Sequence, residues 1–298
     1  MGPSLAAMLV CGYDPSVLLT RWTGEKMDLP LGGLSGPVHI ADEYTTSFYQ
    51  QDGQWAEGPR VQLARRVFKP DGKAEELTFY KPDGSTQIHF QYTFTPAGNL
   101  DTADIYNPDG SLKERWVNRY DDAGKIIETD IADGAGKPTA RKLVEYDAQG
   151  RPIGNWQRDA KGETLGRGYA TYDADSDKIL HYEYAGRNST VVIRRKDGGQ
   201  GVVFTSFQYS EGYKVRSKII DDLGPQGEHL SRTMYDADGN VTSFHRFQNE
   251  FDEHGNVIKS IESNCGTDVL ATGDCSPFRG TYREITYFTS DEPPKAAK

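Results

Sequence analysis

Several features are scarce in this sequence, and each scarcity argues against a class of protein. No stretch approaches the roughly 18 consecutive apolar residues of a membrane-spanning helix. Lys and Arg number 34 against 44 Asp and Glu, and the net charge of −10 would repel a nucleic-acid backbone. Phosphate-binding loops and dinucleotide fingerprints are absent. The six histidines are scattered, and none forms a recognisable nucleophile motif with Ser or Cys. We therefore expect no enzyme, no cofactor and no nucleic-acid partner.

Helical signals are also almost absent, because no capping box leads into a sustained 3.6-residue apolar pattern. Hydrophobic residues make up only 36% of the chain, whereas Tyr (17) and Gly (32) are plentiful. This balance suits a sheet with one wet face, since Tyr can bury its ring and keep its hydroxyl in water. The composition is not that of a disordered chain, because the aromatic residues recur in register.

What the sequence does contain is a repeat of 26 residues. An aromatic residue recurs at this spacing, and so do two sets of glycines that mark two turns in each unit. The aromatic residues are Phe68, Phe94, Tyr120, Tyr146 and Tyr172, and the glycines are Gly72, Gly98, Gly124 and Gly150 in one set and Gly84, Gly110, Gly136 and Gly162 in the other. Turns therefore alternate at spacings of 12 and 14 residues. The runs between them are about eight to ten residues, which is strand length.

Turn chemistry supports this interpretation. Pro70-Asp71-Gly72 is one of several Pro-Asp-Gly turns, in which proline presets the first corner and glycine accepts a positive φ. We predict an all-β fold, an antiparallel meander of 26-residue two-hairpin repeats with about a dozen or more strands. A strip this wide should form a curled single sheet or an open barrel or shell. We expect Phe94, Tyr120, Tyr146 and Tyr172 to pack as an aromatic column on one face.

One elongated β domain with atypical ends is expected. Residues 1–59 would form an N-terminal cap or irregular segment, 60–260 the repeat domain, and 261–298 a cap loop, a last strand and a frayed tail. The apolar run from Ser4 to Cys11 is too short, and lacks the preceding basic residues, for a signal peptide, so the native leader is not visible. Whether Cys11 is buried, reactive or lipidated stays open.

Two of the three cysteines lie close together in the sequence. Cys265 and Cys275 are ten residues apart in a Gly- and Asp-rich loop. We predict a disulfide between them, which would place the protein in the periplasm, at the cell surface or outside the cell. The alternative is a pair of unpaired thiols in a cytosolic loop, and a zinc site would need more ligands than this region offers.

Several turns share an aromatic residue, usually an Asp after it, and a Gly four residues after the aromatic one. They occur at residues 120–126, 146–151, 235–241 and 251–257. This recurrence resembles the YD-repeat (Rhs-repeat) family of bacterial secreted and cell-surface proteins, over roughly residues 60–260. The resemblance implies antiparallel strips that curl into barrels or shells, in a bacterial and exported interaction protein. The chain is shorter than the shell-forming members and its repeat is longer, and no toxin domain is expected after Ser290.

One candidate metal site is present in the sequence. Asp173, Asp175 and Asp177 begin like a calcium loop, but Tyr184 stands where an EF-hand places its bidentate Glu. Because Asp is also an ordinary turn residue, we favour turn chemistry over calcium binding and expect no metal.

The candidate binding residues are polar and aromatic. Arg115, Arg141 and Arg167 lie 26 residues apart and would form a row on a wet sheet face, either gripping an acidic partner or pairing with carboxylates on adjacent strands. We favour the second interpretation. Trp116 and Trp156 are candidates for stacking on sugars if they are exposed on the same sheet.

These observations lead to a functional expectation. The protein should be a non-catalytic exported bacterial module that binds another protein, with an immunity or accessory role beside a secreted toxin as the most concrete option. The alternative is a carbohydrate- or cell-wall-binding protein. A third possibility is a hydrolase that uses a curled sheet as a cup.

Overall fold

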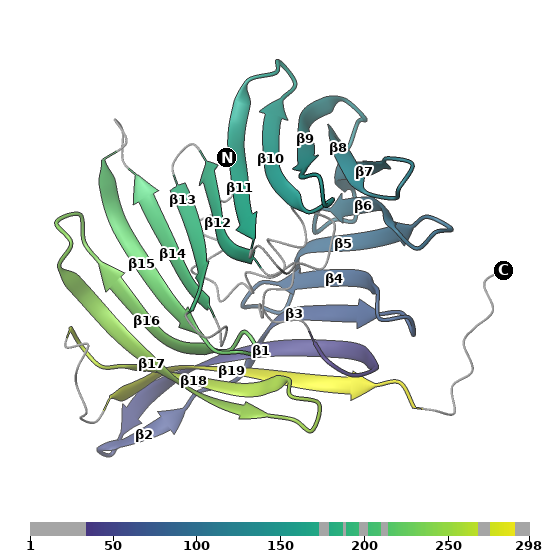
Figure 1. Ribbon diagram of the computed structural model, residues 1–298. Coiled ribbons are helices and arrows are strands. Elements are labelled where there is room, and N and C mark those ends of the chain that lie inside the picture. Colours follow the sequence, from purple (N-terminus) through teal and green to yellow (C-terminus); the bar gives the residue numbers. More distant parts are fainter. Residues whose placement is uncertain are drawn as a thin grey trace.

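The computed structural model describes residues 34–172, 179–186, 189–196, 202–209, 214–267 and 275–289. Within these ranges the fold is all-β, with no helix and with nineteen antiparallel strands in one sheet (Figure 1). The predicted antiparallel meander in a curled single sheet is confirmed. The strands are β1 (Val38–Gln51), β2 (Gln54–Glu57), β3 (Val61–Phe68), β4 (Ala74–Tyr80), β5 (Thr86–Phe94), β6 (Leu100–Tyr106), β7 (Leu112–Tyr120), β8 (Ile126–Asp133), β9 (Pro138–Tyr146), β10 (Pro152–Asp159), β11 (Thr164–Tyr172), β12 (Ile179–Gly186), β13 (Ser189–Arg195), β14 (Val202–Tyr209), β15 (Val215–Leu223), β16 (His229–Tyr235), β17 (Val241–Phe251), β18 (Val257–Asn264) and β19 (Ser276–Tyr287).

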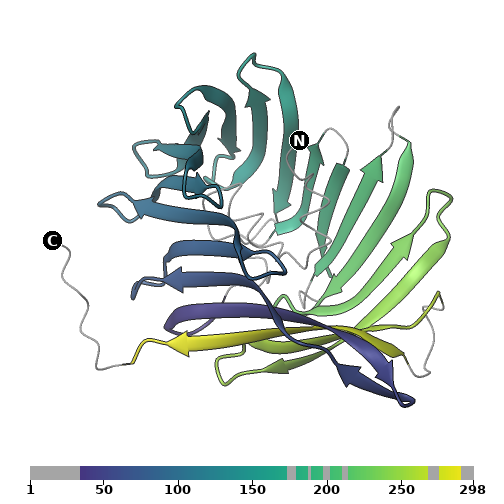
Figure 2. The ribbon, with the colours of Figure 1, turned by 180° about the vertical axis from the view of Figure 1, so that it is seen from behind.

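The sheet curls until the two ends of the meander, β3 and β19, both pair with β1. From β3 to β19 each strand pairs with the next one in the sequence. β1 then pairs with β19 along one edge and with β3 along the other, so that Tyr44 lies opposite both Tyr282 and Gln62. Figures 1 and 2 show the strands following one another around a ring. The segment 1–59 therefore contributes β1, the strand that joins the two ends of the meander.

Most repeat turns are held by one carboxylate and one glycine, whereas in the turn after β5 the Thr95 hydroxyl takes the place of the carboxylate. In the turn after β7, Asp121 Oδ1 accepts hydrogen bonds from the backbone N–H groups of Ala123 (3.0 Å) and Lys125 (2.8 Å). Gly124 has a φ of 80°, which residues with a Cβ rarely adopt. Asp147 and Gly150 repeat the arrangement one unit later. The Asp of the recurring motif thus acts as a turn former.

The repeated tyrosines tie each unit to the one before it. Each hydroxyl donates a hydrogen bond to a backbone carbonyl 20 residues earlier, and these acceptors are themselves 26 residues apart. The bonds are Tyr120 to Leu100 (2.6 Å), Tyr146 to Ile126 (2.8 Å) and Tyr172 to Pro152 (2.7 Å). The rings are half-buried, and a cation of the preceding turn lies over some of them, as Arg151 does 4.7 Å from the Tyr172 ring centroid.

One face of the sheet carries the apolar core. Ala64, Leu77, Phe90 and Ile105 are buried together on β3 to β6, and Trp116 packs against them from β7. Directly paired residues on neighbouring strands share a face, and the register pairs Leu77 with Phe90 and Phe90 with Ile105. We call this side the inner face, because side chains crowd together on the concave side of a curled sheet.

The predicted disulfide is confirmed, with Cys265 and Cys275 joined by an S–S bond of 1.99 Å. Cys265 directly follows β18 and Cys275 directly precedes β19. The bridge therefore closes the connection between these two paired strands.

Candidate functional site

The inner face changes from apolar to charged around the sheet. The pairing register links Ala64 to Glu43 and Glu43 to Arg283, so the face that holds the apolar core continues onto β1 and β19. On β15 to β19 the same face carries charged and titratable side chains. We call these side chains, together with Glu43 on β1, the polar cluster. Its members are Glu43, Asp221, Arg232, His245, Glu262, Arg279 and Arg283.

Asp221 on β15 anchors one end of the polar cluster. Its carboxylate accepts two hydrogen bonds from the Arg232 guanidinium, at 2.6 Å from Nε and 3.3 Å from Nη2. His229 Nδ1 lies 3.6 Å from the same carboxylate, beyond hydrogen-bond length. Burial alone would raise the pKa of Asp221, but the nearby His229 and the charge of Arg232 outweigh it and lower that pKa below its ordinary value. The carboxylate therefore stays ionised although only 5% of the residue is exposed.

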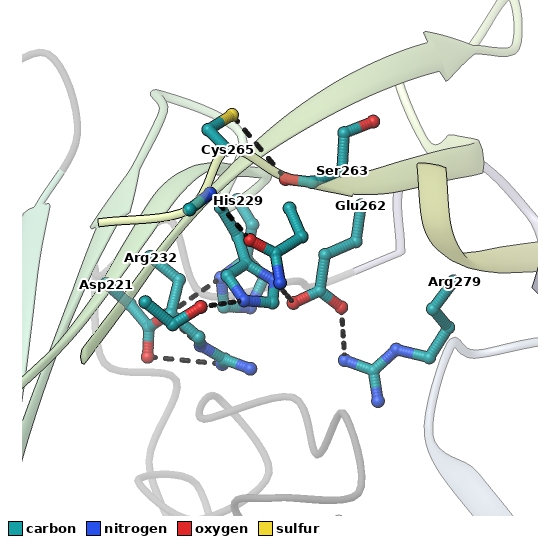
Figure 3. Close-up of polar contacts among 11 residues, drawn as sticks. Asp221, His229, Arg232, Glu262, Ser263, Cys265 and Arg279 are labelled. Atoms are coloured by element: carbon teal, nitrogen blue, oxygen red, sulfur yellow. Dashed lines mark hydrogen bonds and ion pairs between the residues drawn. The ribbon is translucent and has the colours of Figure 1, made fainter. Parts of the chain in front are cut away.

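Glu262 on β18 anchors the other end of the polar cluster. Its Oε2 accepts a hydrogen bond from Arg279 Nη2 at 2.6 Å (Figure 3). Its Oε1 lies 2.8 Å from His245 Nδ1. Burial would raise the pKa of Glu262, but His245 and Arg279 together lower it. This end of the cluster therefore also keeps its carboxylate charged.

A cavity of about 100 Å³ opens beside the polar cluster. Its charged lining is balanced, because three carboxylates face three guanidiniums: Glu43, Glu228, Glu262, Arg232, Arg279 and Arg283. Asn249 also lines it, donating from Nδ2 to the His229 carbonyl at 2.7 Å, while its buried Oδ1 has no hydrogen-bond partner among the described residues. The cavity can hold a few waters or a small polar group that donates to this oxygen.

Ser243 and His245 on β17 form a contact that the sequence analysis missed. They are two residues apart on one strand, so their side chains share a face. Ser243 Oγ lies 2.5 Å from His245 Nε2. The local signal was the Ser-x-His spacing in a strand, whereas Glu262 comes from the neighbouring strand and follows only from the register.

An open cleft lies at the rim of the sheet between the β1–β2 hairpin and the start of β19. Its volume is about 410 Å³, and we call it the aromatic cleft. It is lined by Phe48, Trp55, Pro277 and Phe278 and by the polar residues Asn264, Gly266 and Ser276. Trp55 is 44% exposed and Phe278 is 51% exposed. Phe278 also packs edge-on against the His245 ring, with 5.6 Å between centroids, so the aromatic cleft adjoins the polar cluster.

The arginines proposed as a binding row lie on the outer face and have partners within the chain. Arg115 makes two hydrogen bonds of 2.6 Å to Asp104 on the adjacent strand. Arg141 Nε lies 3.0 Å from Asp130 and 3.2 Å from Glu128. The Arg167 guanidinium lies 5.4 Å from the centroid of the Tyr169 ring. A partner's carboxylates would have to compete with the chain's own for Arg115 and Arg141, and a binding role for the row stays a prediction.

Trp116 and Trp156 lie on opposite faces of the sheet. Trp116 packs in the inner core with Lys142 Nζ 3.9 Å from its ring centroid. Trp156 lies on the outer face opposite Arg167 and meets the Tyr169 ring edge-on, with 6.3 Å between centroids. The two indoles therefore cannot stack on one sugar chain.

Asp173, Asp175 and Asp177, proposed as a weak calcium candidate, lie outside the described residues, as does Cys11. Across the ranges that the structure describes, no group of three or more His, Cys, Asp and Glu is placed to hold a metal ion. Within the same ranges, no helix has the length and apolarity to cross a membrane.

Comparisons with known proteins give only distant likenesses. No family model matches the chain, and no curated protein matches it. A porin-like protein from Bacteroides uniformis ATCC 8492 superposes with a TM-score of 0.34 and 10% identity, over 85% of this chain and 98% of that one. The complex TcdB2-TccC3-Cdc42 gives 0.32 and 10% identity, over 79% of this chain and 15% of that one, and TcdB2-TccC3 gives 0.32 and 10% over 74% and 14%. At these TM-scores the likenesses assign neither a family nor a function.

Proposed function

We propose that this chain is an exported bacterial interaction protein that binds another protein through the aromatic cleft and the adjoining β1–β2 hairpin. The observation that carries the proposal is the exposure of large aromatic side chains at one rim of the sheet. Trp55 and Phe278 line the aromatic cleft, and Tyr49 is 49% exposed on the other face of the hairpin. Trp and Tyr are enriched among the residues that carry protein–protein binding energy.

The hairpin also offers a strand edge. Residues 54–57 of β2 pair with the end of β1, and no second strand pairs with β2 among the residues that the structure describes. The backbone N–H and C=O groups on the outer edge of such a strand can pair with an extended segment of a partner. A partner that adds a strand here would lie beside the aromatic cleft, where one of its apolar side chains could be buried.

The compartment and the partner class follow from two further considerations. The Cys265–Cys275 disulfide supports an oxidising compartment outside the cytoplasm. The resemblance to YD-repeat proteins supports a bacterial origin and makes a secreted toxin the most concrete partner, with this chain as its immunity or accessory protein. A toxin gene beside the gene for this chain would support that assignment.

Quantitative binding to a purified candidate partner tests the proposal. Trp55→Ala should weaken binding by about 30-fold or more, the effect of losing about 2 kcal/mol at an interface anchor. Tyr169→Ala on the outer face of β11 is the matched control, because Tyr169 is 41% exposed and Trp55 is 44% exposed. Equal affinity of both variants and the parent chain would refute the role of the aromatic cleft.

Carbohydrate binding is the second candidate, and the lining of the aromatic cleft favours it specifically. Aromatic rings stand there beside Asn264 and Ser276, whose side chains can hydrogen-bond sugar hydroxyls. A glycan array separates the two functions. Retention of an oligosaccharide by the parent chain and its loss in Trp55→Ala would support carbohydrate over protein as the ligand.

A further inference from the structure

Three side chains near the aromatic cleft lie in the order expected of a nucleophile, a base and an orienting carboxylate. Ser243 Oγ lies 2.5 Å from His245 Nε2, and His245 Nδ1 lies 2.8 Å from Glu262 Oε1. His245 and Glu262 are 6% and 3% exposed, whereas Ser243 is half-buried and so partly open. This order of contacts is the one by which serine hydrolases activate a hydroxyl.

The triad adjoins a place where a substrate can sit. Asn264 lies directly opposite His245 on β18, and the backbone N–H of Phe244 donates to the Gly266 carbonyl at 2.6 Å. Asn264 and Gly266 both line the aromatic cleft, as does Phe278, which packs against the His245 ring. Three residues of the cleft lining therefore border the strand segment that carries Ser243 and His245.

We propose that Ser243 and His245 form a hydrolytic site for carboxylic esters with a short apolar acyl group. The acyl group would occupy the aromatic cleft against Phe48, Trp55 and Phe278. A cleft of about 410 Å³ has the size of a small-molecule site. This activity belongs to the third class of function that the sequence leaves open, and it goes beyond the binding role proposed above.

The reaction balances without a cofactor. Ser243 Oγ attacks the ester carbonyl carbon while its proton passes to His245 Nε2. The tetrahedral intermediate then collapses, the C–O bond to the alcohol breaks, and His245 returns the proton to the leaving oxygen. Water attacks the resulting acyl-serine by the same route, releasing the carboxylic acid and restoring Ser243.

A donor for the oxyanion is also available. Asn264 Oδ1 accepts the backbone N–H of Gly266 at 2.7 Å, which holds one end of the amide and leaves the Nδ2 hydrogens as the donors that this side chain offers to a ligand. Asparagine amides serve this purpose in other hydrolases. Glu262 acts through His245 and is therefore a positioning residue.

One part of the geometry must adjust for catalysis. The approach of His245 Nδ1 to Glu262 is short but off the N–H axis, so that Nδ1 has no in-line acceptor among the described residues. A small rotation of the ring would make this hydrogen bond linear. Hydrogen bonds in a catalytic site often tighten only when substrate binds.

The test uses the full chain, a fluorescent alkyl fluorophosphonate and p-nitrophenyl butyrate. The probe should label the native chain at Ser243, identified by mass spectrometry of the modified peptide, and the chain should hydrolyse the ester. Ser243→Ala should abolish labelling and reduce hydrolysis by at least about 100-fold. Ser263→Ala is the matched control and should match the parent in both assays, because Ser263 follows Glu262 on β18 and so points to the opposite face.

A further variant separates catalysis from folding. Glu262→Gln should lower kcat while KM stays close to that of the parent chain, whereas a purely structural role would change thermal stability without this split. Absence of fluorophosphonate labelling in the native parent chain would overturn the proposal, and so would equal labelling of Ser243→Ala. Partner binding distinguishes the two proposals, since Ser243→Ala should leave it intact and Trp55→Ala should not.

Discussion

The tyrosine hydroxyls that link successive repeats give the sharpest stability prediction. In Tyr146→Phe the ring is kept, and the 2.8 Å hydrogen bond from its hydroxyl to the Ile126 carbonyl is lost. A hydrogen bond of this kind contributes about 1 kcal/mol net, with a range of roughly 0.5 to 1.5. We therefore expect Tyr146→Phe to lower the free energy of unfolding by about 1 kcal/mol.

The equivalent change at Tyr120 should cost less. The Leu100 carbonyl that accepts the Tyr120 hydroxyl at 2.6 Å also accepts Asn118 Nδ2 at 2.9 Å, so it keeps a partner in Tyr120→Phe. The converse change is Phe94→Tyr, at one of the two repeat positions that hold Phe and so lack a hydroxyl. The carbonyl 20 residues earlier belongs to Ala74, and a new bond to it should stabilise the chain by up to about 1 kcal/mol.

Urea unfolding at neutral pH measures these differences. At a slope near 2 kcal/mol per M, a loss of 1 kcal/mol lowers the midpoint by roughly 0.5 M. Because equivalent tyrosines lie two strands apart, about 10 Å, their effects should add. Unchanged midpoints in Tyr146→Phe would show that water replaces the bond at no cost and would refute the proposed link between repeats.

Three further predictions concern charge and redox state. The pKa values of Asp221 and Glu262 are lowered in the folded chain, so both carboxylates stabilise the fold fully above their ordinary pKa near 4. This contribution should be lost as the pH falls, so the urea midpoint should drop between about pH 5 and 3. The drop should be smaller in Asp221→Asn, which lacks one of the two carboxylates. Reduction of Cys265–Cys275 should lower stability by about 2 to 3 kcal/mol, and thiol titration of the unreduced, unfolded chain should find one free thiol. Arg141→Glu places a third carboxylate beside Glu128 and Asp130 on an exposed face, and should lower the free energy of unfolding by less than about 1 kcal/mol. Slower capture of an acidic partner by this variant would support a binding role for the arginine row.

The sequence predicts the repeat turns well because their chemistry is local. Asp121 reaches the backbone N–H groups two and four residues ahead, and Gly124 supplies the positive φ that closes the same turn. All partners lie within five residues, so spacing and residue type are sufficient. The tyrosine hydrogen bonds span 20 residues and needed the structure, although the 26-residue period already places their donors at equivalent positions.

The strand that joins the two ends of the meander could not be predicted in the same way. β1 lies before the repeat and pairs Tyr44 with Tyr282, 238 residues later. Periodicity indicates which strands follow one another, but it does not indicate which strand meets the last one. The sequence predicts only a cap or irregular segment for residues 1–59, and the partners of β1 on both sides depend on how far the whole sheet curls.

The candidate sites lie where the chain departs from its repeat, and there is a physical reason for this. In β3 to β7 the inner face is filled by apolar side chains such as Leu77 and Phe90 that pack against the next unit, which leaves little room for other chemistry. On β15 to β19 charged groups occupy the same face. They are stable there because each carboxylate pairs with a cation on the adjacent strand, as Asp221 pairs with Arg232. A site that combines such pairs with an open cleft needs strands of unequal length and a hairpin that leaves the sheet. β1, β2 and β19 supply these irregular parts, and β17 and β18 beside them carry Ser243, His245 and Glu262.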